Sequence, residues 1–241
     1  MTEEEIRSQL IWRFTIAQRP LGRWRLNTYV LWKRVAWKAV VGSTLFVKRG
    51  FDIVVSFILL LILSPIFLVA AILVKMDGGP AFLTQFRVGK HGREFKMYKF
   101  RSMVVNADQV FEKLRAQNQH EDGVTFKMKN DPRITKVGKW LRKFSVDELP
   151  QFLNVFIGDM SLVGPRPCLP REVALYTLEQ RRRLEVLPGI TCFWQIGGRA
   201  EIDFSGQVQL DVRYIESHTF WGDVKILFKT VPAVLFGKGA Y

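Results

Sequence analysis

Two adjacent carboxylates, Asp147 and Glu148, lie in the segment FSVDELPQFLNVF at residues 144–156. A carboxylate can transfer protons, bind a divalent metal or attack a phosphorus atom. The same pair also fits an ordinary helix start, because Ser145 and Glu148 form the capping-box pattern S-x-x-E ahead of an apolar run with helical spacing. If the cap is Asp147 itself, Pro150 lies in the first turn, where its missing N–H is tolerated. We therefore predict a helix start here, with Asp147 at the positive end.

Basic residues flank this pair in the sequence. Arg142 precedes it, and Arg166 follows it in GDMSLVGPRPCLP, where it stands between two prolines. Because proline fixes φ, the loop that carries Arg166 has a stiff backbone, and a guanidinium held in this way suits phosphate oxygens. Asp147 could therefore attack a phosphorus atom while cations and a divalent metal disperse the phosphoryl charge. The alternative is that the acidic residues only stabilise a helix N-terminus.

The composition indicates an anionic partner. The chain of 241 residues has 36 Lys and Arg against 22 Asp and Glu, a formal net charge of +14. Nucleic acid, a phosphorylated substrate and acidic lipid are the candidates for such a charge. Cys168 and Cys192 form no CxxC pattern, so neither a zinc site nor a disulfide framework is predicted. The first residues are acidic and lack an apolar run, which predicts no cleavable signal peptide.

Residues 53–74, IVVSFILLLILSPIFLVAAILV, contain no charge. As a helix they would measure about 33 Å, enough to cross the hydrocarbon core of a bilayer. Ser64 and Pro65 lie in the middle, and a proline there predicts a bend. Basic residues on both sides favour a cytoplasmic location for both flanks. A re-entrant hairpin satisfies both flanks, whereas a through-span places one outside; the residues alone leave both topologies open.

The segments around this apolar stretch predict further elements. Residues 19–42 mix basic and aromatic side chains, which is typical of a helix at an anionic membrane surface, and nucleic-acid binding is the less favoured alternative. Residues 81–100 predict a β-hairpin around GKHG, and residues 106–117 predict a helix.

The C-terminal part reads as further helices. Residues 170–188 begin with a proline and predict one helix, on which Arg181 to Arg183 form a solvated face. Residues 223–237 predict a helix with Asp223 as its N-cap and a kink at Pro232. The predicted fold class is therefore α-rich α+β, with one compact unit after the apolar segment.

Five stretches of the chain, covering residues 46–241 in order, resemble the bacterial sugar transferase family, the monotopic phosphoglycosyl transferases. The stretches are KRGFDIVVSFILLLILSPIFLVAAILVKMDGG, FRVGKHGREFKMYKFRSM, DPRITKVGKWLRKFSVDELPQFLNVFIGDMSLVGPRP, LPGITCFWQIGGR and LDVRYIESHTFWGDVKILFKTVPAVLFGKGAY. A single DE pair would be weak, but DELPQ followed by GDMSLVGPRP and then by PGIT and WQ is specific.

The resemblance implies transfer of hexose-1-phosphate from a UDP-sugar to undecaprenyl phosphate, the first membrane step of surface-polysaccharide synthesis. Asp147 matches the family's nucleophile, which takes the sugar phosphate covalently and expels UMP. Glu148 matches the acid/base group of the lipid-phosphate step. The family uses Mg2+, with the aspartate near the metal. Residues that match phosphate-holding positions are Lys99, Arg142 and Arg166. Residues that fit either a nucleotide or sugar contact or a structural turn are Gln195 and Arg199.

The resemblance also implies a location and a domain plan. It favours a re-entrant helix broken at Ser64 and Pro65 in one leaflet of the bacterial inner (plasma) membrane, with the catalytic domain on the cytoplasmic face. The predicted segments are an interfacial segment at 1–47, a re-entrant hairpin at 48–76 and a transferase domain at 77–241. His218 departs from the family, which usually has an aromatic residue there.

The expected partners are a UDP-sugar, undecaprenyl phosphate and anionic lipids, without nucleic acid. The competing interpretation from a different class is a non-catalytic membrane-surface scaffold that binds anionic lipid. The sequence specifies neither the sugar nor whether the protein forms a homodimer.

Overall fold

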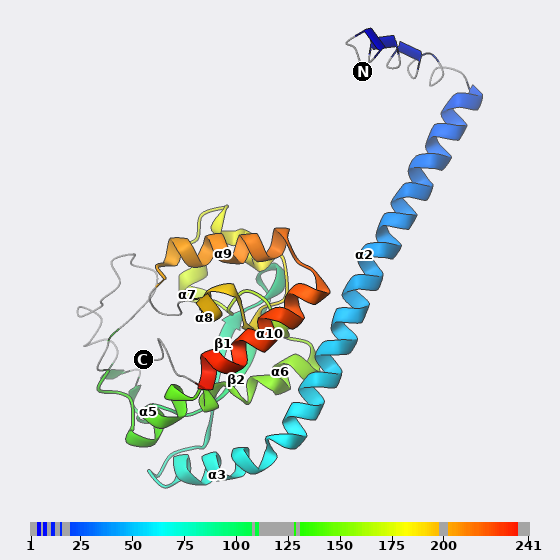
Figure 1. The fold of residues 1–241 in the computed structure, drawn as a ribbon. Coiled ribbons are helices and arrows are strands. Elements are labelled where there is room, and N and C mark those ends of the chain that lie inside the picture. Colours follow the sequence, from blue (N-terminus) through cyan, green and yellow to red (C-terminus); the bar gives the residue numbers. More distant parts are fainter. Residues whose placement is uncertain are drawn as a thin grey trace. The chain divides into compact units, whose positions relative to one another are not determined.

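The protein is described here by a computed structural model, shown in Figure 1. The described residues are 20–107, 109–110, 128, 131–197 and 202–235, with isolated residues among the first 15. Most of the helix predicted at 106–117 lies outside them, and so does Arg199. The chain divides into two compact units, Met1–Lys48 and Arg49–Tyr241.

The first unit contains the beginning of helix α2 (Pro20–Ile62). Its aromatic side chains are exposed: Trp24 and Trp32 each keep 67% of their surface. Lys33 places its ammonium 4.7 Å from the centre of the Tyr29 ring, one helical turn away. The predicted helix is therefore present, with basic and aromatic side chains facing outwards. Its contact with a membrane stays a prediction.

Helix α2 ends at Ile62, and helix α3 (Ser64–Lys75) begins after Leu63 with a bend of 60°. Pro65 occupies the first turn of α3, where its missing N–H breaks no helical hydrogen bond. The Ser64 hydroxyl donates to the Leu61 carbonyl at 2.8 Å. The predicted bend is confirmed (Figure 1). Among the described helices, none is long and apolar enough by itself to cross a bilayer, and α2 with α3 passes that test only as a bent pair.

The hairpin predicted at 81–100 is confirmed. Strands β1 (Phe82–Val88) and β2 (Glu94–Phe100) pair antiparallel, and the chain reverses through His91 and Gly92, which both have positive φ. The register places Arg87 opposite Phe95 and Lys99 opposite Leu83. Since side chains alternate along a strand, Arg87 and Lys99 project from the same face of the hairpin. A second sheet consists of two short parallel strands, β3 (Ser161–Val163) and β4 (Gly189–Thr191).

Helical segments make up most of the rest, in agreement with the predicted α-rich α+β class. They are α5 (Lys136–Lys143), η3 (Val146–Glu148), α6 (Gln151–Ile157), α7 (Pro170–Val173), η4 (Gln180–Leu184), α8 (Phe193–Gly197), α9 (Phe204–Glu216) and α10 (Phe220–Leu235).

The single helix predicted at 170–188 is wrong. Helix α7 has four residues, and a turn separates it from the 3-10 segment η4. In this turn the side chain of Gln180 accepts from the backbone N–H of Thr177 at 2.9 Å, which replaces a helical hydrogen bond. The solvated Arg181–Arg183 face is wrong in part, because Arg183 is buried and forms an ion pair with Asp211.

The predicted N-cap at Asp223 is also wrong. Helix α10 begins at Phe220, and the hydroxyl of Thr219 accepts from the backbone N–H of Gly222 at 3.0 Å. The Asp223 carboxylate is buried instead, 2.9 Å from the Tyr214 hydroxyl and 3.1 Å from Nε2 of His218. Pro232 lies inside the helix, which continues to Leu235.

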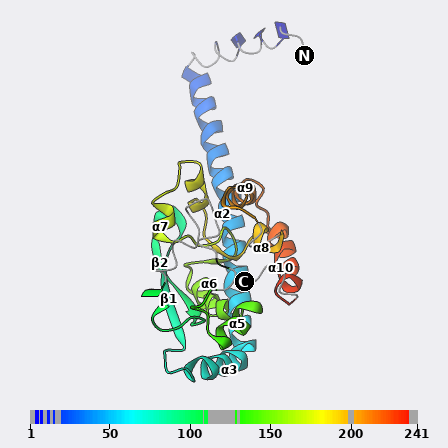
Figure 2. The same cartoon turned by 90° about the vertical axis from the view of Figure 1, so that its left-hand side faces the viewer.

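Helix α6 lies beside the β1–β2 hairpin and is held there by one buried side chain (Figure 1 and Figure 2). Asn154 accepts from the backbone N–H of Tyr98 at 3.0 Å and donates to the Lys96 carbonyl at 2.8 Å. The opposite end of α6 is held by Arg49 of α2, which donates to the carbonyls of Val155 and Phe156 at 2.6 and 2.8 Å. These contacts fix the turn that precedes α6 against the hairpin.

Candidate active site

Asp147 and Glu148 lie in the 3-10 turn η3, which joins α5 to α6. The predicted α-helix start at Asp147 is wrong: α6 begins at Gln151. Pro150 has no N–H for an i→i−4 hydrogen bond. The turn before it closes with i→i−3 hydrogen bonds instead, such as the bond from Leu149 N to Val146 O at 3.2 Å. The Ser145 side chain forms no cap, and its φ of 53° turns the chain sharply before Asp147.

Glu148 is held between two cations. Its Oε1 accepts from Nζ of Lys99 and from Nη2 of Arg166, each at 3.0 Å. Burial alone would raise the pKa of Glu148, but Lys99 and Arg166 outweigh burial and hold that pKa far below its usual range. Burial also lowers the pKa of Lys99, against the effect of Glu148. Glu148 is therefore ionised and paired at neutral pH.

Asp147 has the opposite character. Its side chain is buried, and none of the described residues donates a hydrogen bond to its carboxylate. Burial and the adjacent charge of Glu148 raise its pKa, while Lys99 and Arg142 act in the opposite direction. Two neighbouring carboxylates whose environments separate their pKa values are typical of sites where one group reacts and the other transfers a proton.

Arg142, on α5, faces the same turn. Its Nε lies 3.2 Å from the hydroxyl of Ser102, in the segment that follows β2. Helix α5 packs directly on this segment, because a Cβ at Gly138 would lie 1.9 Å from the Ser102 carbonyl oxygen. Only a glycine at that position lets Arg142 approach Ser102 so closely.

The loop that carries Arg166 is fastened by backbone hydrogen bonds. Gly164 N donates to Thr191 O at 3.0 Å, and Gly189 N donates to Pro165 O at 2.8 Å. On the other side of the loop, Val88 N of β1 donates to the Cys168 carbonyl at 2.9 Å. The stiffness predicted from the two prolines is thus reinforced by contacts to both sheets.

Arg87 belongs to the same cationic cluster, and the sequence analysis did not single it out. Its Nη1 donates to the Pro167 carbonyl at 3.0 Å and its Nη2 to Oε1 of Gln85 at 2.7 Å, while its buried Nε has no hydrogen-bond partner among the described residues. Burial and the charge of Arg166 lower the pKa of Arg87 to about 10. The signal was available, because the period of two along a hairpin places Arg87 and Lys99 on one face.

The other predicted residues are placed as follows. Gln195, on α8, accepts from the buried thiol of Cys192 at 3.2 Å. Ser64 and Pro65 form the bend of the α2–α3 pair. Within the described part of the chain, no group of three His, Cys, Asp or Glu side chains gathers as a metal site.

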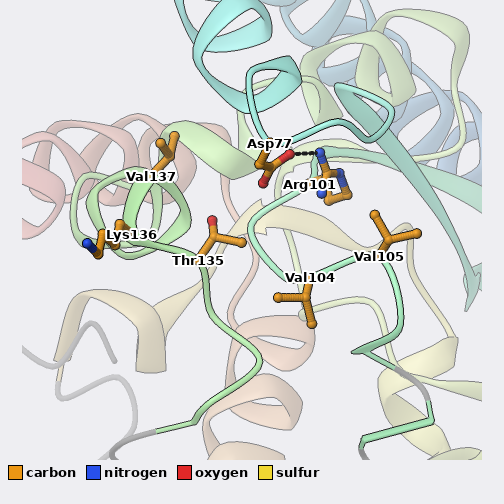
Figure 3. Close-up of a pocket in the computed structure, with 7 residues that line it drawn as sticks. All are labelled: Asp77, Arg101, Val104, Val105, Thr135, Lys136 and Val137. Carbon is orange, nitrogen blue, oxygen red and sulfur yellow. Dashed lines mark hydrogen bonds and ion pairs between the residues drawn. The ribbon is translucent and has the colours of Figure 1, made fainter.

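A pocket of about 340 Å³ lies on one side of α5 (Figure 3). It is bounded by the ion pair of Asp77 and Arg101, by the first turn of α5, and by Val104 and Val105 of the segment after β2. Arg101 is buried and donates to the carbonyls of Val74 and Pro80 at 3.0 and 2.7 Å, so its hydrogen-bonding capacity serves the fold. The lining residues are Asp77, Arg101, Val104, Val105, Thr135, Lys136 and Val137.

A paired acid beside an unpaired, buried acid, with guanidinium and ammonium groups around both, is suited to phosphoryl transfer. Comparison with known proteins agrees, because the profile of the bacterial sugar transferase family matches residues 43–237. The chain belongs to this family.

Three relatives illustrate the similarity. The galactosyl transferase CpsE of Streptococcus agalactiae is 48% identical over 225 residues, 91% of this chain and 49% of that protein. The undecaprenyl-phosphate galactose phosphotransferase of Salmonella typhimurium is 47% identical over 202 residues, 83% of this chain and 42% of that protein. The exopolysaccharide production protein ExoY of Rhizobium meliloti is 42% identical over 198 residues, 80% of this chain and 88% of that protein. The chain thus spans less than half of the first two relatives and most of the third.

Proposed function

We propose that this protein transfers hexose-1-phosphate from a UDP-sugar to undecaprenyl phosphate and releases UMP. The observation that carries the proposal is the contrast within η3: Asp147 is buried with no hydrogen-bond donor among the described residues, whereas Glu148 is locked by Lys99 and Arg166. The similarity to the undecaprenyl-phosphate galactose phosphotransferase of Salmonella typhimurium supports this reaction class.

The transfer takes two steps. A carboxylate oxygen of Asp147 attacks the phosphorus atom next to the sugar, the bond from this phosphorus to the bridging oxygen breaks, and UMP leaves with the electron pair. A phosphate oxygen of the lipid then attacks the same phosphorus and restores the free Asp147 carboxylate. Burial favours the first step, since a poorly solvated carboxylate with no hydrogen bond to break is ready to attack.

The cations serve the phosphates and, through them, Glu148. When Arg166 and Lys99 turn toward the oxygens of an arriving diphosphate, Glu148 loses the two charges that keep its pKa low. Its pKa then rises, and the carboxylate becomes able to accept the proton of the lipid phosphate. Arg87 adds a third cation at the edge of this cluster.

The residues present fit a magnesium ion that arrives with the substrate. Mg2+ in nucleotide sites is held by one or two carboxylates together with phosphate oxygens and water, and the Asp147 carboxylate accepts no hydrogen bond from the described residues. Bound there, Mg2+ would neutralise phosphate charge. Arg166 and Lys99 would orient the same diphosphate.

We place the reaction at the cytoplasmic face of the bacterial plasma membrane, with α2 and α3 as a re-entrant pair. The bend of 60° and the basic flanks of the apolar segment support this topology. A cysteine introduced before Lys48 should be protected from an impermeant reagent added to whole cells and labelled after lysis. Labelling from outside would favour a through-span.

The proposal is tested by incubating the purified protein with Mg2+ and a panel of UDP-sugars, without lipid. The wild-type protein should release up to one UMP per active site and gain the mass of a hexose phosphate, whereas Asp147→Asn should do neither. Asp203→Asn, which keeps the N-cap of α9, is the matched control. If product forms with lipid phosphate present but no adduct ever appears, direct transfer replaces the covalent route. If no UDP-sugar is consumed at all, the result favours the interpretation of the protein as a non-catalytic membrane-surface scaffold.

A further inference from the structure

We infer that Trp194 is the positioning residue for Arg166: its indole ring supports the guanidinium that reaches Glu148, and a buried ion pair behind the ring fixes its orientation. This inference rests on the proposed function, because it assigns a task to Arg166 in the transfer reaction.

The first contact lies between the ring and the guanidinium. The Cζ atom of Arg166 lies 6.0 Å from the centre of the Trp194 ring, within the range of a cation–π interaction, and tryptophan is the strongest aromatic partner for a cation. The other end of the guanidinium donates to Glu148 at 3.0 Å. Arg166 keeps 35% of its side-chain surface exposed, so these two contacts restrict a side chain that is otherwise open to solvent.

The second contact lies behind the ring. Trp194 is 7% exposed, and its Nε1 forms no regular hydrogen bond with the described residues. The carboxylate of Asp211, on α9, lies close enough for the indole N–H to affect its pKa. Burial raises the pKa of Asp211 to about 6, and both Arg183 and the indole N–H of Trp194 act against that rise. The indole N–H is thus close to a buried negative charge, while the ring itself carries the Arg166 guanidinium.

The Asp211 carboxylate is itself held rigidly. Nη2 of Arg183 lies 2.6 Å from Oδ2 of Asp211, and the two side chains are 4% and 1% exposed. The Arg183 guanidinium lies 5.9 Å from the ring centre of Tyr176 and 5.6 Å from that of Phe204, so aromatic rings support it as well. Neither member of such an enclosed ion pair can exchange its partner for a ligand. The fixed position of the pair is suited to supporting the Trp194 ring.

Trp194 and the loop of Arg166 are joined through one strand. Helix α8, which carries Trp194, follows β4 directly, and β4 receives the backbone hydrogen bond from Gly164 at the start of the Arg166 loop. The backbone segments that carry the ring and the guanidinium are thus both attached to β4. A change in the ring should therefore alter the direction of Arg166 without loosening the loop.

A double-mutant cycle separates positioning from general support of the fold. The four proteins are wild type, Trp194→Leu, Arg166→Gln and the double variant, with Trp221→Leu on the exposed face of α10 as the matched tryptophan control. Two quantities are measured: the rate of UMP release from the UDP-sugar, and the Kd of UDP by calorimetry, which needs no transfer. The unfolding temperature of each variant is measured as well.

If Trp194 acts through Arg166, Trp194→Leu lowers UMP release about tenfold in the wild-type background and has almost no further effect in Arg166→Gln, which has no charge to hold over the ring. Trp194→Phe, which keeps a ring but loses the N–H, should lose about threefold, and it replaces Leu in the cycle if Trp194→Leu does not fold. Trp221→Leu should match wild type.

Equal factors in both backgrounds, or wild-type rates in Trp194→Leu, would overturn the inference and leave the proposed function standing. If the wild-type protein binds UDP but releases no UMP, the proposed function fails, and the same cycle on the Kd decides the role of Trp194. A protein that neither binds UDP nor releases UMP would overturn both.

Discussion

Two acidic side chains of this protein are each held by an arginine, and they behave in opposite ways. Glu148 faces Arg166 and Lys99 in a cluster where Arg166 is 35% exposed. Asp211 faces Arg183 in a pair that is 1% and 4% exposed. Cations outweigh burial at Glu148 and lower its pKa, whereas burial outweighs one cation at Asp211 and raises its pKa to about 6.

The difference shows that solvent exposure and the number of cationic partners decide whether an ion pair can open to bind a ligand. In a partly exposed cluster, the two cations can leave Glu148 and turn to an arriving phosphate. Water and the phosphate then solvate the charges that have lost their partners. A closed pair has no such compensation, and breaking it leaves a buried charge. The first arrangement suits ligand exchange and the second suits support.

The largest expected effect comes from the residue beside the open cluster. Asp147→Asn should lower transfer at least about 1,000-fold, because an amide is a poor nucleophile. Its unfolding temperature at pH 7 should equal or exceed that of wild type, since the raised pKa of Asp147 means that burial disfavours the charge it carries there. Product formation and calorimetry check both parts. A strong loss of stability would give Asp147 a structural role.

The closed pair should be the more important for stability. Asp211→Ala leaves the Arg183 guanidinium buried and unpaired, which should lower the free energy of unfolding by about 3–5 kcal/mol. Glu148→Gln should cost clearly less, because Lys99 and Arg166 can turn to water. Denaturant unfolding of both variants tests the order, and the reverse order would remove the distinction between the two clusters.

Arg166→Lys should lower kcat/KM by roughly 10- to 100-fold with the unfolding temperature unchanged, since lysine keeps the charge but loses the planar fork. Steady-state rates with UDP-sugar and lipid phosphate measure the effect. The equivalent change at the closed pair, Arg183→Lys, should act mainly on the unfolding temperature. Wild-type rates in Arg166→Lys would make the loop purely structural.

The smallest effect is a shift in pH dependence. If Asp147 attacks as a carboxylate, as proposed, UMP release should rise as the pH increases through its raised pKa. Glu148→Gln removes a neighbouring negative charge, so the pKa of Asp147 falls and the acid limb of the profile moves to lower pH. Single-turnover release without lipid measures this limb. An unmoved limb would mean that burial alone raises the pKa of Asp147. With lipid present, the same variant should be slowed chiefly in the second step.

Local chemistry made several features predictable. A proline in an uncharged stretch predicts the bend between α2 and α3, and alternating side chains around GKHG predict the hairpin. The stiff loop of Arg166 follows from its two prolines. Its approach to Glu148 could be anticipated only through the family resemblance, since 17 residues separate the two positions.

The features that were missed depend on contacts between distant segments. Nothing in the run RRR indicates that Arg183 turns inward, because its partner Asp211 belongs to another helix. The helix start at Asp147 failed because S-x-x-E and a proline fit a 3-10 turn as well as a cap, and the left-handed φ of Ser145 has no sequence signal. Arg87 was hidden among many basic residues, although the register of the hairpin pairs its face with that of Lys99.

Helix α6 has a consequence for how the active site responds to helix α2. One end of this seven-residue helix receives Arg49, just before the apolar stretch, and the other end follows the turn η3, which carries Asp147. Its length is about 10 Å. Helix α6 is thus a short rigid link between Arg49 and the turn that carries Asp147, and a displacement of α2 at Arg49 would be passed on to that turn.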